Sequence, residues 1–167
     1  MIRAARPEEI ALLPQIENAA DERYVRVGLR CVLEMPPQSL VSLERGRRRG
    51  MLWVATSPLG RVVGFALMER PGNTAWLDQL SVLDLWQGRG LGTALIDRTA
   101  GRARQLGHDR LYLSTYLDVP WNAPFYERRG FSSVPRGAWP RAFRLQFAIE
   151  NGHGHPPWRR TIMQRDI

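Results

Sequence analysis

A glycine-rich turn at residues 87–92, Gln-Gly-Arg-Gly-Leu-Gly, is the feature of this sequence that most restricts its fold. The apolar run Thr74–Leu83 before it is typical of a β-strand, and Leu91–Leu106 after it carries apolar residues at helical spacing. Glycines between a strand and a helix allow backbone N–H groups to converge at the helix N-terminus, where phosphate binds. Because glycine also serves turns that bind nothing, the turn alone does not decide between a phosphate site and a structural role.

The spacing of these glycines differs from that of the dinucleotide-binding fingerprint. That motif needs a third glycine at position 93, which is Thr93, and a strand ending in an acidic residue about twenty residues further on. The pattern therefore argues against a Rossmann fold.

Strand and helix patterns alternate along the chain, and no repeat or linker divides it. Two apolar runs joined by Ser-Pro-Leu-Gly predict an antiparallel hairpin, and the glycine turn with its flanking elements predicts a crossover between strands. The other elements predicted are strands at 2–5, 51–56, 62–68, 111–116, 131–134 and 159–163, and helices at 7–20, 21–33, 38–45 and 122–129. Residues 136–158 are expected to form a loop, in which His153 and His155 are flexible rather than catalytic or metal-binding. His108 is expected in a surface loop.

Composition places the chain among globular proteins. Its 167 residues, 44% of them hydrophobic, are enough for one domain with a core, and no run of about eighteen apolar residues could span a membrane. The N-terminus has arginines where a secretory signal has its apolar segment, so a cytoplasmic protein is expected. The single cysteine, Cys31, can form no internal disulfide and is expected to pack as a small side chain on a helix.

All 24 basic residues are arginine, and the formal net charge is +8. Such a surface attracts polyanions and so fits a nucleic-acid ligand, but a negatively charged cofactor or an arginine-rich genome explains it equally well. The basic segment 45–50 is expected to be a solvated loop before a phosphate or nucleic-acid patch.

Around the glycine turn the sequence resembles the GNAT superfamily of N-acetyltransferases, whose signature Gln/Arg-x-x-Gly-x-Gly/Ala is matched by Gln87, Gly90 and Gly92. A second segment that looks like the family runs from Asn122 to Phe131, and the likeness is close over residues 50–135. The Val-Pro-Trp-Asn-Ala-Pro-Phe-Tyr segment looks typical of one bacterial subgroup. The resemblance implies a single domain over residues 1–167 with an α+β fold. It also implies a central mixed, mostly antiparallel sheet of six to seven strands, flanked by helices on both faces.

The resemblance further implies acetyl-CoA as co-substrate, no metal ion, and direct transfer of the acetyl group to a primary amine in a ternary complex. Backbone N–H groups of the turn would hold the diphosphate. The strand near Leu80 would separate from strand 111–116, so that pantetheine could pair with its backbone. The cofactor-binding residues expected are Leu80, Ser81, Val82, Gln87, Gly88, Arg89, Gly90, Leu91, Gly92, Thr93, Asn122, Phe125 and Tyr126. Arg89 could instead face solvent, and Asn122 could also serve as a helix N-cap.

Such a transfer needs an acid for the leaving thiolate and a base for the ammonium. Tyr126 stands where the family has its tyrosine acid, although it could also be an aromatic residue of the core. Asp78 ranks first as the base, because strand alternation would place it on the same face as Leu80 and Val82. Its rivals, as bases or as ligands of a cationic substrate, are Glu17, Asp21 and Glu22.

Three kinds of function stay open at this level. The first is an enzyme that acetylates a small-molecule or peptide amine, and the second is an acyl-CoA-binding sensor or interaction module without turnover. The third, acetylation of an RNA-linked amine such as aminoacyl-tRNA, is motivated by the charge, but the sequence has no aromatic base-reading motif. A monomer and a homodimer both fit, no membrane partner is expected, and the acceptor is not identified.

Overall fold

The structure, a computed structural model, describes residues 1–167 and is built on one seven-stranded sheet in the order β1-β2-β3-β4-β5-β7-β6. Its strands are β1 (Ile2–Ala4), β2 (Leu52–Thr56), β3 (Val62–Glu69), β4 (Ala75–Val82), β5 (Arg110–Tyr116), β6 (Ser132–Ser133) and β7 (Arg160–Asp166). All neighbouring strands are antiparallel except β4 and β5, which are parallel. This is the mixed, mostly antiparallel sheet that the sequence predicts.

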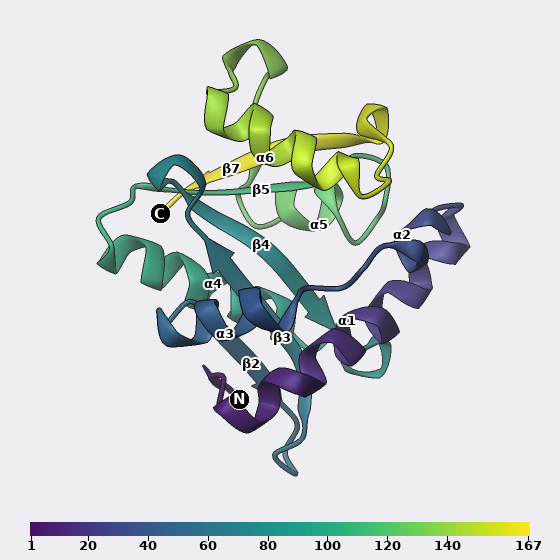
Figure 1. Cartoon of the computed structure of the whole chain (residues 1–167), viewed down its shortest axis with the longest axis vertical. Helices are drawn as coiled ribbons and strands as arrows, with labels where there is room; N and C mark the ends of the chain where they lie inside the picture. Colours follow the sequence, from purple (N-terminus) through teal and green to yellow (C-terminus); the bar gives the residue numbers. More distant parts are fainter.

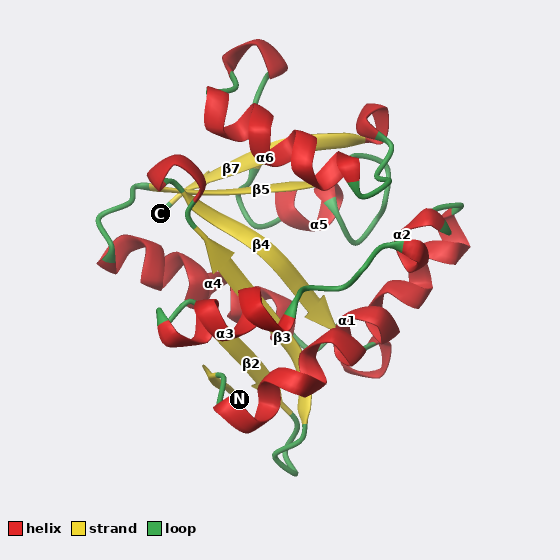
Figure 2. Ribbon diagram, in the orientation of Figure 1, coloured by secondary structure: helices red, strands yellow, loops and turns green.

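Helices cover both faces of the sheet, as predicted (Figures 1 and 2). They are α1 (Leu13–Asp21), α2 (Cys31–Glu34), α3 (Leu40–Arg48), α4 (Leu91–Gln105), α5 (Ala123–Glu127) and α6 (Arg141–Gly152). On one face Leu13 of α1 and Leu43 of α3 pack against Phe65, and on the other Leu95 and Ile96 of α4 belong to the largest core cluster. No helix combines the length and the hydropathy of a membrane span.

The N-terminal helical region is more broken than the sequence predicts. The expected helix at 7–20 is a 3₁₀ segment, Pro7–Leu12, followed by α1, with Pro14 in the first turn of α1. The expected helix at 21–33 is interrupted at Gly28, which adopts φ 73°. This left-handed conformation ends the 3₁₀ segment Glu22–Val27 before α2 begins.

The prediction of a loop over 136–158 is wrong, because these residues contain α6. Phe143 and Phe147, one helical turn apart, are buried together against Trp76 of β4. Burial of each phenylalanine stabilises the fold by about 2 kcal/mol. This stabilisation offsets part of the conformational entropy that is lost when the helix forms. The apolar spacing was present in the sequence, but the prolines and glycines on either side obscured it.

The parallel strands β4 and β5 separate soon after they pair. Only Ala75 and Trp76 of β4 have partners on β5, whereas β4 continues to Val82 and β5 to Tyr116. Figure 1 shows the two strands diverging. The predicted separation of these strands is confirmed, and it leaves one edge of β4 without a neighbouring strand.

Candidate active site

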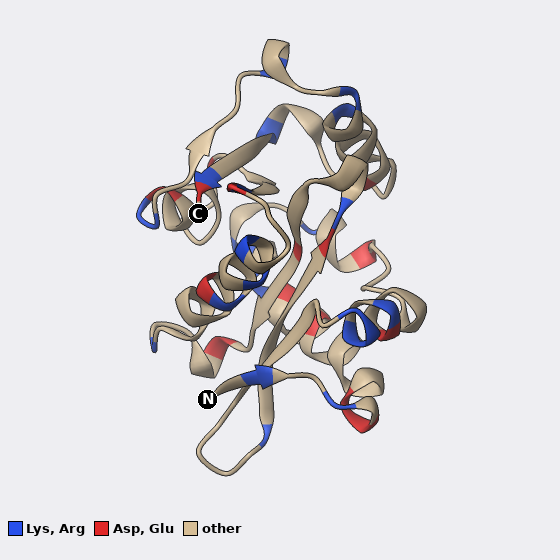
Figure 3. Ribbon diagram, turned by 90° about the vertical axis from the view of Figure 1, so that its left-hand side faces the viewer, with Lys and Arg blue, Asp and Glu red and all other residues tan.

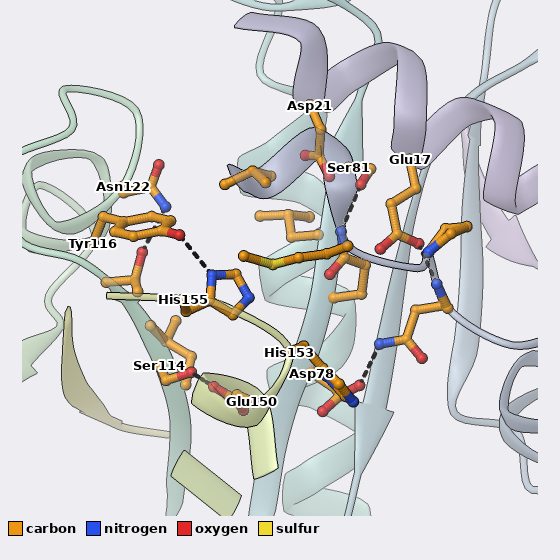
Figure 4. Close-up of a pocket in the computed structure, with 18 of the residues that line it drawn as sticks. Glu17, Asp21, Asp78, Ser81, Ser114, Tyr116, Asn122, Glu150, His153 and His155 are labelled. Carbon is orange, nitrogen blue, oxygen red and sulfur yellow. Dashed lines mark hydrogen bonds between the residues drawn. The ribbon is translucent and has the colours of Figure 1, made fainter. Parts of the chain in front are cut away.

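The space between β4 and β5 continues into a cavity of about 480 Å³. Its walls come from α1, the segment before α3, both strands, α5, and α6 with the loop after it. Of the site residues that the sequence predicts, the cavity is lined by Glu17, Asp21, Asp78, Leu80, Ser81, Asn122 and Tyr126. Glu22 is exposed and does not line the cavity. Figure 4 shows Glu17 and Asp21 pointing from α1 toward the cavity, across from Tyr116 and His155.

The glycine turn lies outside this cavity, at the N-terminus of α4. Gly88 and Gly90 adopt φ values of 70° and 78°, a conformation that L side chains rarely adopt. Open space surrounds the position of a Cβ at either glycine. The first N–H groups of α4 have no acceptor within the helix. An exposed turn at a helix N-terminus, with no side chain at Gly88 or Gly90, has the donors and the room that a diphosphate requires.

Gln87 holds the turn in place rather than facing a ligand. Its Nε2 donates to the carbonyl oxygen of Val82 at 2.8 Å and to Oδ1 of Asp84 at 3.0 Å, and its Oε1 accepts from Arg23. The guanidinium of Arg89, an exposed residue, lies 5.0 Å from the centre of the Trp86 ring. The side chain of Gln87 thus joins the end of β4 to the turn.

Four residues join the start of α4 to α5 and the turn that follows it. A Cβ on Gly92 would lie 3.2 Å from Cζ of Phe125, so the two helices approach closely there. The Arg129 guanidinium lies 3.6 Å from the centre of the Phe125 ring, and its Nε donates to Oγ1 of Thr93 at 2.7 Å. Sequence reasoning missed Arg129, because only the fold brings it beside the turn.

A valine at Gly92 is therefore expected to push α5 away from the turn. It should weaken the binding of CoA, the ligand that the sequence predicts for this turn, by roughly tenfold or more, about 1.4 kcal/mol. Titration calorimetry with CoA measures this. Gly101→Val is the matched control, because Gly101 lies in the same helix and a Cβ there meets only the end of Arg104 at 4.0 Å. Equal CoA affinity for the Gly92 variant and the control would contradict this account of the turn.

Asn122 connects the cavity wall to β5. Its Nδ2 donates to Oγ1 of Thr115 at 2.9 Å, and its amide lies 3.1 Å from the hydroxyl of Tyr24. The Asn122 side chain makes no N-cap hydrogen bond. Its backbone carbonyl instead accepts from the N–H groups of Phe125 and Tyr126.

Tyr126 places a phenol on the cavity wall. The residue is 9% exposed, and its ring packs edge-on against Phe125 and Phe131. Its hydroxyl lies at the cavity and takes part in none of the side-chain hydrogen bonds of the protein. Burial raises the pKa of Tyr126 above its usual value, so the phenol is protonated at neutral pH. A protonated phenol without a partner is a proton donor available to a ligand.

The predicted orientation of Asp78 is wrong. Gln79 pairs with Leu67 and Leu77 with Met68, so Asp78 is the extra residue of a β-bulge. The bulge reverses the alternation of faces along β4, and Leu80 and Val82 pack on the α4 side, away from the α1 side that Asp78 faces.

Asp78 is held in the cavity by two amides. Its carboxylate accepts from Nε2 of Gln38 at 2.7 Å and from Nε2 of Gln146 at 3.2 Å. Burial, together with the nearby carboxylates of Glu150 and Glu69, raises the pKa of Asp78 to about 7. A carboxylate with this pKa can accept a proton at neutral pH.

Glu17 and Asp21 lie one turn apart on α1 and have similarly raised pKa values. Glu17 accepts from the backbone N–H of Gln38 at 3.0 Å. Burial raises its pKa to about 8, and burial raises that of Asp21 to about 7. The cavity therefore collects carboxyl groups that titrate near neutrality.

The prediction that His155 is flexible is wrong. The residue is half-buried, and its Nδ1 is hydrogen-bonded to the hydroxyl of Tyr116. Burial and the positive charge of Arg160 lower its pKa to about 3, so the imidazole is neutral at pH 7. His153 also lines the cavity, although it is exposed.

The raised pKa of Glu17 predicts a stability that falls with pH. Below pH 4.5, the ordinary pKa of a glutamate, Glu17 is protonated in both the folded and the unfolded state, so its ionisation does not affect the free energy of unfolding. The cost of ionising it grows by about 1.4 kcal/mol per pH unit up to a pH near 8. Glu17→Gln removes this cost, so the variant should unfold at a temperature several degrees higher than the wild type at pH 9 and at the same temperature at pH 4. Thermal unfolding between pH 4 and pH 9 tests this prediction, with Glu22→Gln as control. If the unfolding temperatures of wild type and Glu17→Gln changed with pH in the same way, Glu17 would not be a buried carboxyl that ionises in this range.

The sheet opens between two parallel strands, and a glycine turn lies at a helix N-terminus beside the end of β4, but a fold by itself does not decide an activity. The model of the Acetyltransferase (GNAT) family matches residues 13–131, and the chain belongs to this family.

Solved structures share the fold at low sequence identity. N-acetylglutamate synthase from Neisseria gonorrhoeae, complexed with coenzyme A and N-acetyl-glutamate, matches 99% of this chain with a TM-score of 0.72 at 19% identity. The chain spans 34% of the length of that enzyme. Rv2747 from Mycobacterium tuberculosis, solved with CoA, matches 100% of this chain and 99% of its own length with a TM-score of 0.71 at 19% identity. PaiA N-acetyltransferase from Thermoplasma acidophilum, solved with coenzyme A, matches 100% of this chain and 98% of its own length, with a TM-score of 0.70 at 15% identity.

Proposed function

We propose that this chain is a cytoplasmic, single-domain N-acetyltransferase that moves the acetyl group of acetyl-CoA directly to a primary amine in a ternary complex. The observation that carries the proposal is the cavity between β4 and β5, which is lined by ionisable carboxyls, together with the exposed glycine turn that lies outside it at the N-terminus of α4. We also assign the chain to the bacterial subgroup that the 119–126 segment resembles.

Two parts of the backbone would hold acetyl-CoA. The N–H groups of residues 88–93 fit its diphosphate, because the turn is exposed and the α4 dipole favours an anion there. The edge of β4 beyond Trp76 lacks a neighbour on the β5 side and can pair with the pantetheine arm as an added strand would. When bound, acetyl-CoA supplies an activated acetyl group as a thioester.

Asp78 and Tyr126 would carry the two proton transfers. Asp78 accepts the proton of the ammonium, which leaves a nucleophilic amine. Tyr126 donates its proton to the sulfur as the carbon–sulfur bond breaks and the carbon–nitrogen bond forms, and the second proton that the nitrogen loses as the amide forms restores the phenol. Cys31 is not among the cavity residues, so no cysteine thiol is placed to form an acetyl-enzyme intermediate. This favours direct transfer.

The two other functions predict different results. A sensor would bind acetyl-CoA but release no thiol with any amine. An enzyme acting on an RNA-linked amine would retain tRNA and lose it steeply as salt is raised. The carboxyl groups of the cavity favour a cationic acceptor over a polyanionic one.

Thiol release from acetyl-CoA over a panel of amines, amino acids, aminoglycosides and peptide N-termini tests the proposal. Release that depends on one class of amine, together with its acetylated product, is the expected result. If none of the amines in the panel causes thiol release while CoA still binds, the proposed transfer is overturned in favour of the sensor.

A further inference from the structure

Three of the four acidic residues that line the cavity form no salt bridge with an arginine, although none of the three is exposed. Arginines are spread over helices, strands and loops on the side of the molecule seen in Figure 3, and the salt bridges join them to carboxylates elsewhere. None of these salt bridges involves Glu17, Asp21 or Asp78. In a chain with 24 arginines and 16 acidic residues, this cavity holds three carboxyls that form no ion pair.

Two of these three carboxyls accept hydrogen bonds from neutral amides instead of forming ion pairs with arginines. Gln38 donates from its backbone to Glu17 and from its side chain to Asp78. Gln146 donates from Nε2 to both Asp78 and Glu150, at 3.2 and 3.1 Å. Amides can orient carboxylates by hydrogen bonds but cannot cancel their charge. The carboxylates are therefore positioned without being neutralised.

The arginines that line the cavity leave a negative excess. Arg160 is committed to Glu150 at 2.8 Å, and Arg23 contacts Gln87 and stacks 4.7 Å over the Trp121 ring. The cavity is lined by four carboxyl groups, those of Glu17, Asp21, Asp78 and Glu150, and by two guanidinium groups. When all the carboxyls are ionised, they outnumber the guanidinium groups by two.

The reaction uses only one of these two charges. The reacting nitrogen must lose its proton, and one carboxylate receives it, so the attacking amine is not a cation when it attacks. Tyr126, a buried residue of the cavity wall whose hydroxyl has no hydrogen-bond partner, marks the side of the cavity where the thioester would lie. The negative charge that remains once Glu17 and Asp21 ionise favours a cation that stays charged throughout.

We propose that the acceptor is a flexible aliphatic diamine or polyamine, whose non-reacting ammonium binds between Glu17 and Asp21 while Asp78 serves the reacting nitrogen. The inference rests on the proposed function and deepens it by naming the acceptor class. Glu17 and Asp21 suit this role because they are four residues apart on α1 and so project from the same face of the helix. Inside a cavity their attraction for an ammonium is screened less by salt than it would be on the surface.

Three acceptors built on the same four-carbon chain test the proposal: tetramethylenediamine, butylamine, and the amino acid in which a carboxylate replaces the second amine. They share the reacting amine and the chain and differ in the group at the far end, which is a cation, absent or an anion. We expect kcat/KM to be roughly 10- to 100-fold higher for the diamine than for butylamine, as a charged hydrogen bond predicts, and lowest for the amino acid. Equal values for the diamine and butylamine would overturn the diamine inference and leave the proposed transfer standing.

Matched variants locate the effect. Glu17→Gln and Asp21→Asn should each reduce the ratio of kcat/KM between diamine and butylamine toward one. Glu22→Gln, on the exposed side of the same region, should keep the wild-type ratio. A wild-type ratio in both cavity variants would show that the second ammonium binds elsewhere and would overturn the assignment.

A binding measurement keeps the inference testable if no amine is acetylated. Calorimetric titration of the CoA-loaded protein with tetramethylenediamine should give binding that Glu17→Gln weakens and Glu22→Gln does not. If the diamine binds without thiol release, the proposed transfer fails and the cation site stands. If the diamine does not bind, the cation site fails, whatever the enzyme does with other amines.

Discussion

Asp78→Asn is expected to lower kcat by roughly 100- to 1,000-fold, within the range that general acid–base catalysis contributes. Asparagine keeps the size of the side chain and can still accept from Gln38, so the β-bulge should survive and only proton acceptance should be lost. Steady-state thiol release with a saturating amine measures the effect. Asp97→Asn is the matched control, because Asp97 lies on the exposed side of α4, outside the cavity.

The pH profile distinguishes a base from a residue that only supports the structure. A base must be ionised to act, so wild-type kcat/KM should rise with pH and level off above a pH near 7, the pKa to which burial and Glu150 raise Asp78. The groups facing Asp78 are Glu150 and Glu69, which raise its pKa, and Arg160, which lowers it. The residual activity of Asp78→Asn should lack this rise. The same inflection in the variant would assign the base to Glu17 or Asp21 instead.

Tyr126→Phe is expected to lower kcat by roughly 100-fold or more, because the leaving thiolate loses its proton donor. The ring would still pack between Phe125 and Phe131, and the hydroxyl has no hydrogen bond in the protein to lose. The dissociation constant for CoA should therefore change far less than kcat does. Thiol release and CoA titration on the same preparation give both values.

Tyr112→Phe serves as the control for Tyr126→Phe. Tyr112 lies on β5 and packs against Phe143, away from the cavity wall. An undiminished kcat in Tyr126→Phe would show that Tyr126 is not the proton donor and serves only as an aromatic residue of the core.

The glycine turn and its setting could be predicted from the sequence because both are local. Helical spacing from Leu91 onward and the apolar run before Gln87 decide that a strand meets a helix there. Gly88 and Gly90 reflect backbone conformations within the turn itself, whereas the close contact at Gly92 is with Phe125 of α5. The separation of β4 from β5 followed from the family resemblance and was not visible in either strand.

The orientation of Asp78 could not be predicted, because a β-bulge is a property of two paired strands. Nothing in β4 alone indicates that Leu67 and Met68 of β3 face Gln79 and Leu77, with Asp78 left over. Strand alternation, applied without the bulge, placed Asp78 on the wrong face. Asp78 stayed a candidate base even so, since the bulge turns it into the cavity.

The part of the cavity wall that α6 supplies was missed for a related reason. In the sequence, Glu150 and Gln146 look like ordinary polar residues of a surface helix. They reach the cavity because the phenylalanines of α6 pack on β4. Only then does Gln146 reach Asp78, some seventy residues earlier in the chain. Contacts between such distant residues leave no local pattern in a single sequence.

A crystal structure with CoA and tetramethylenediamine is the most direct test of the central claim, that acetyl-CoA and an amine meet between β4 and β5. The account predicts density for the diphosphate at residues 88–93, for pantetheine along β4 beyond Trp76, and for the diamine beside Glu17 and Asp21. A second, basic cavity is lined by Trp86 and by Met1, Arg3, Arg6 and Arg89. CoA bound in that cavity, with the space between β4 and β5 left empty, would contradict the account.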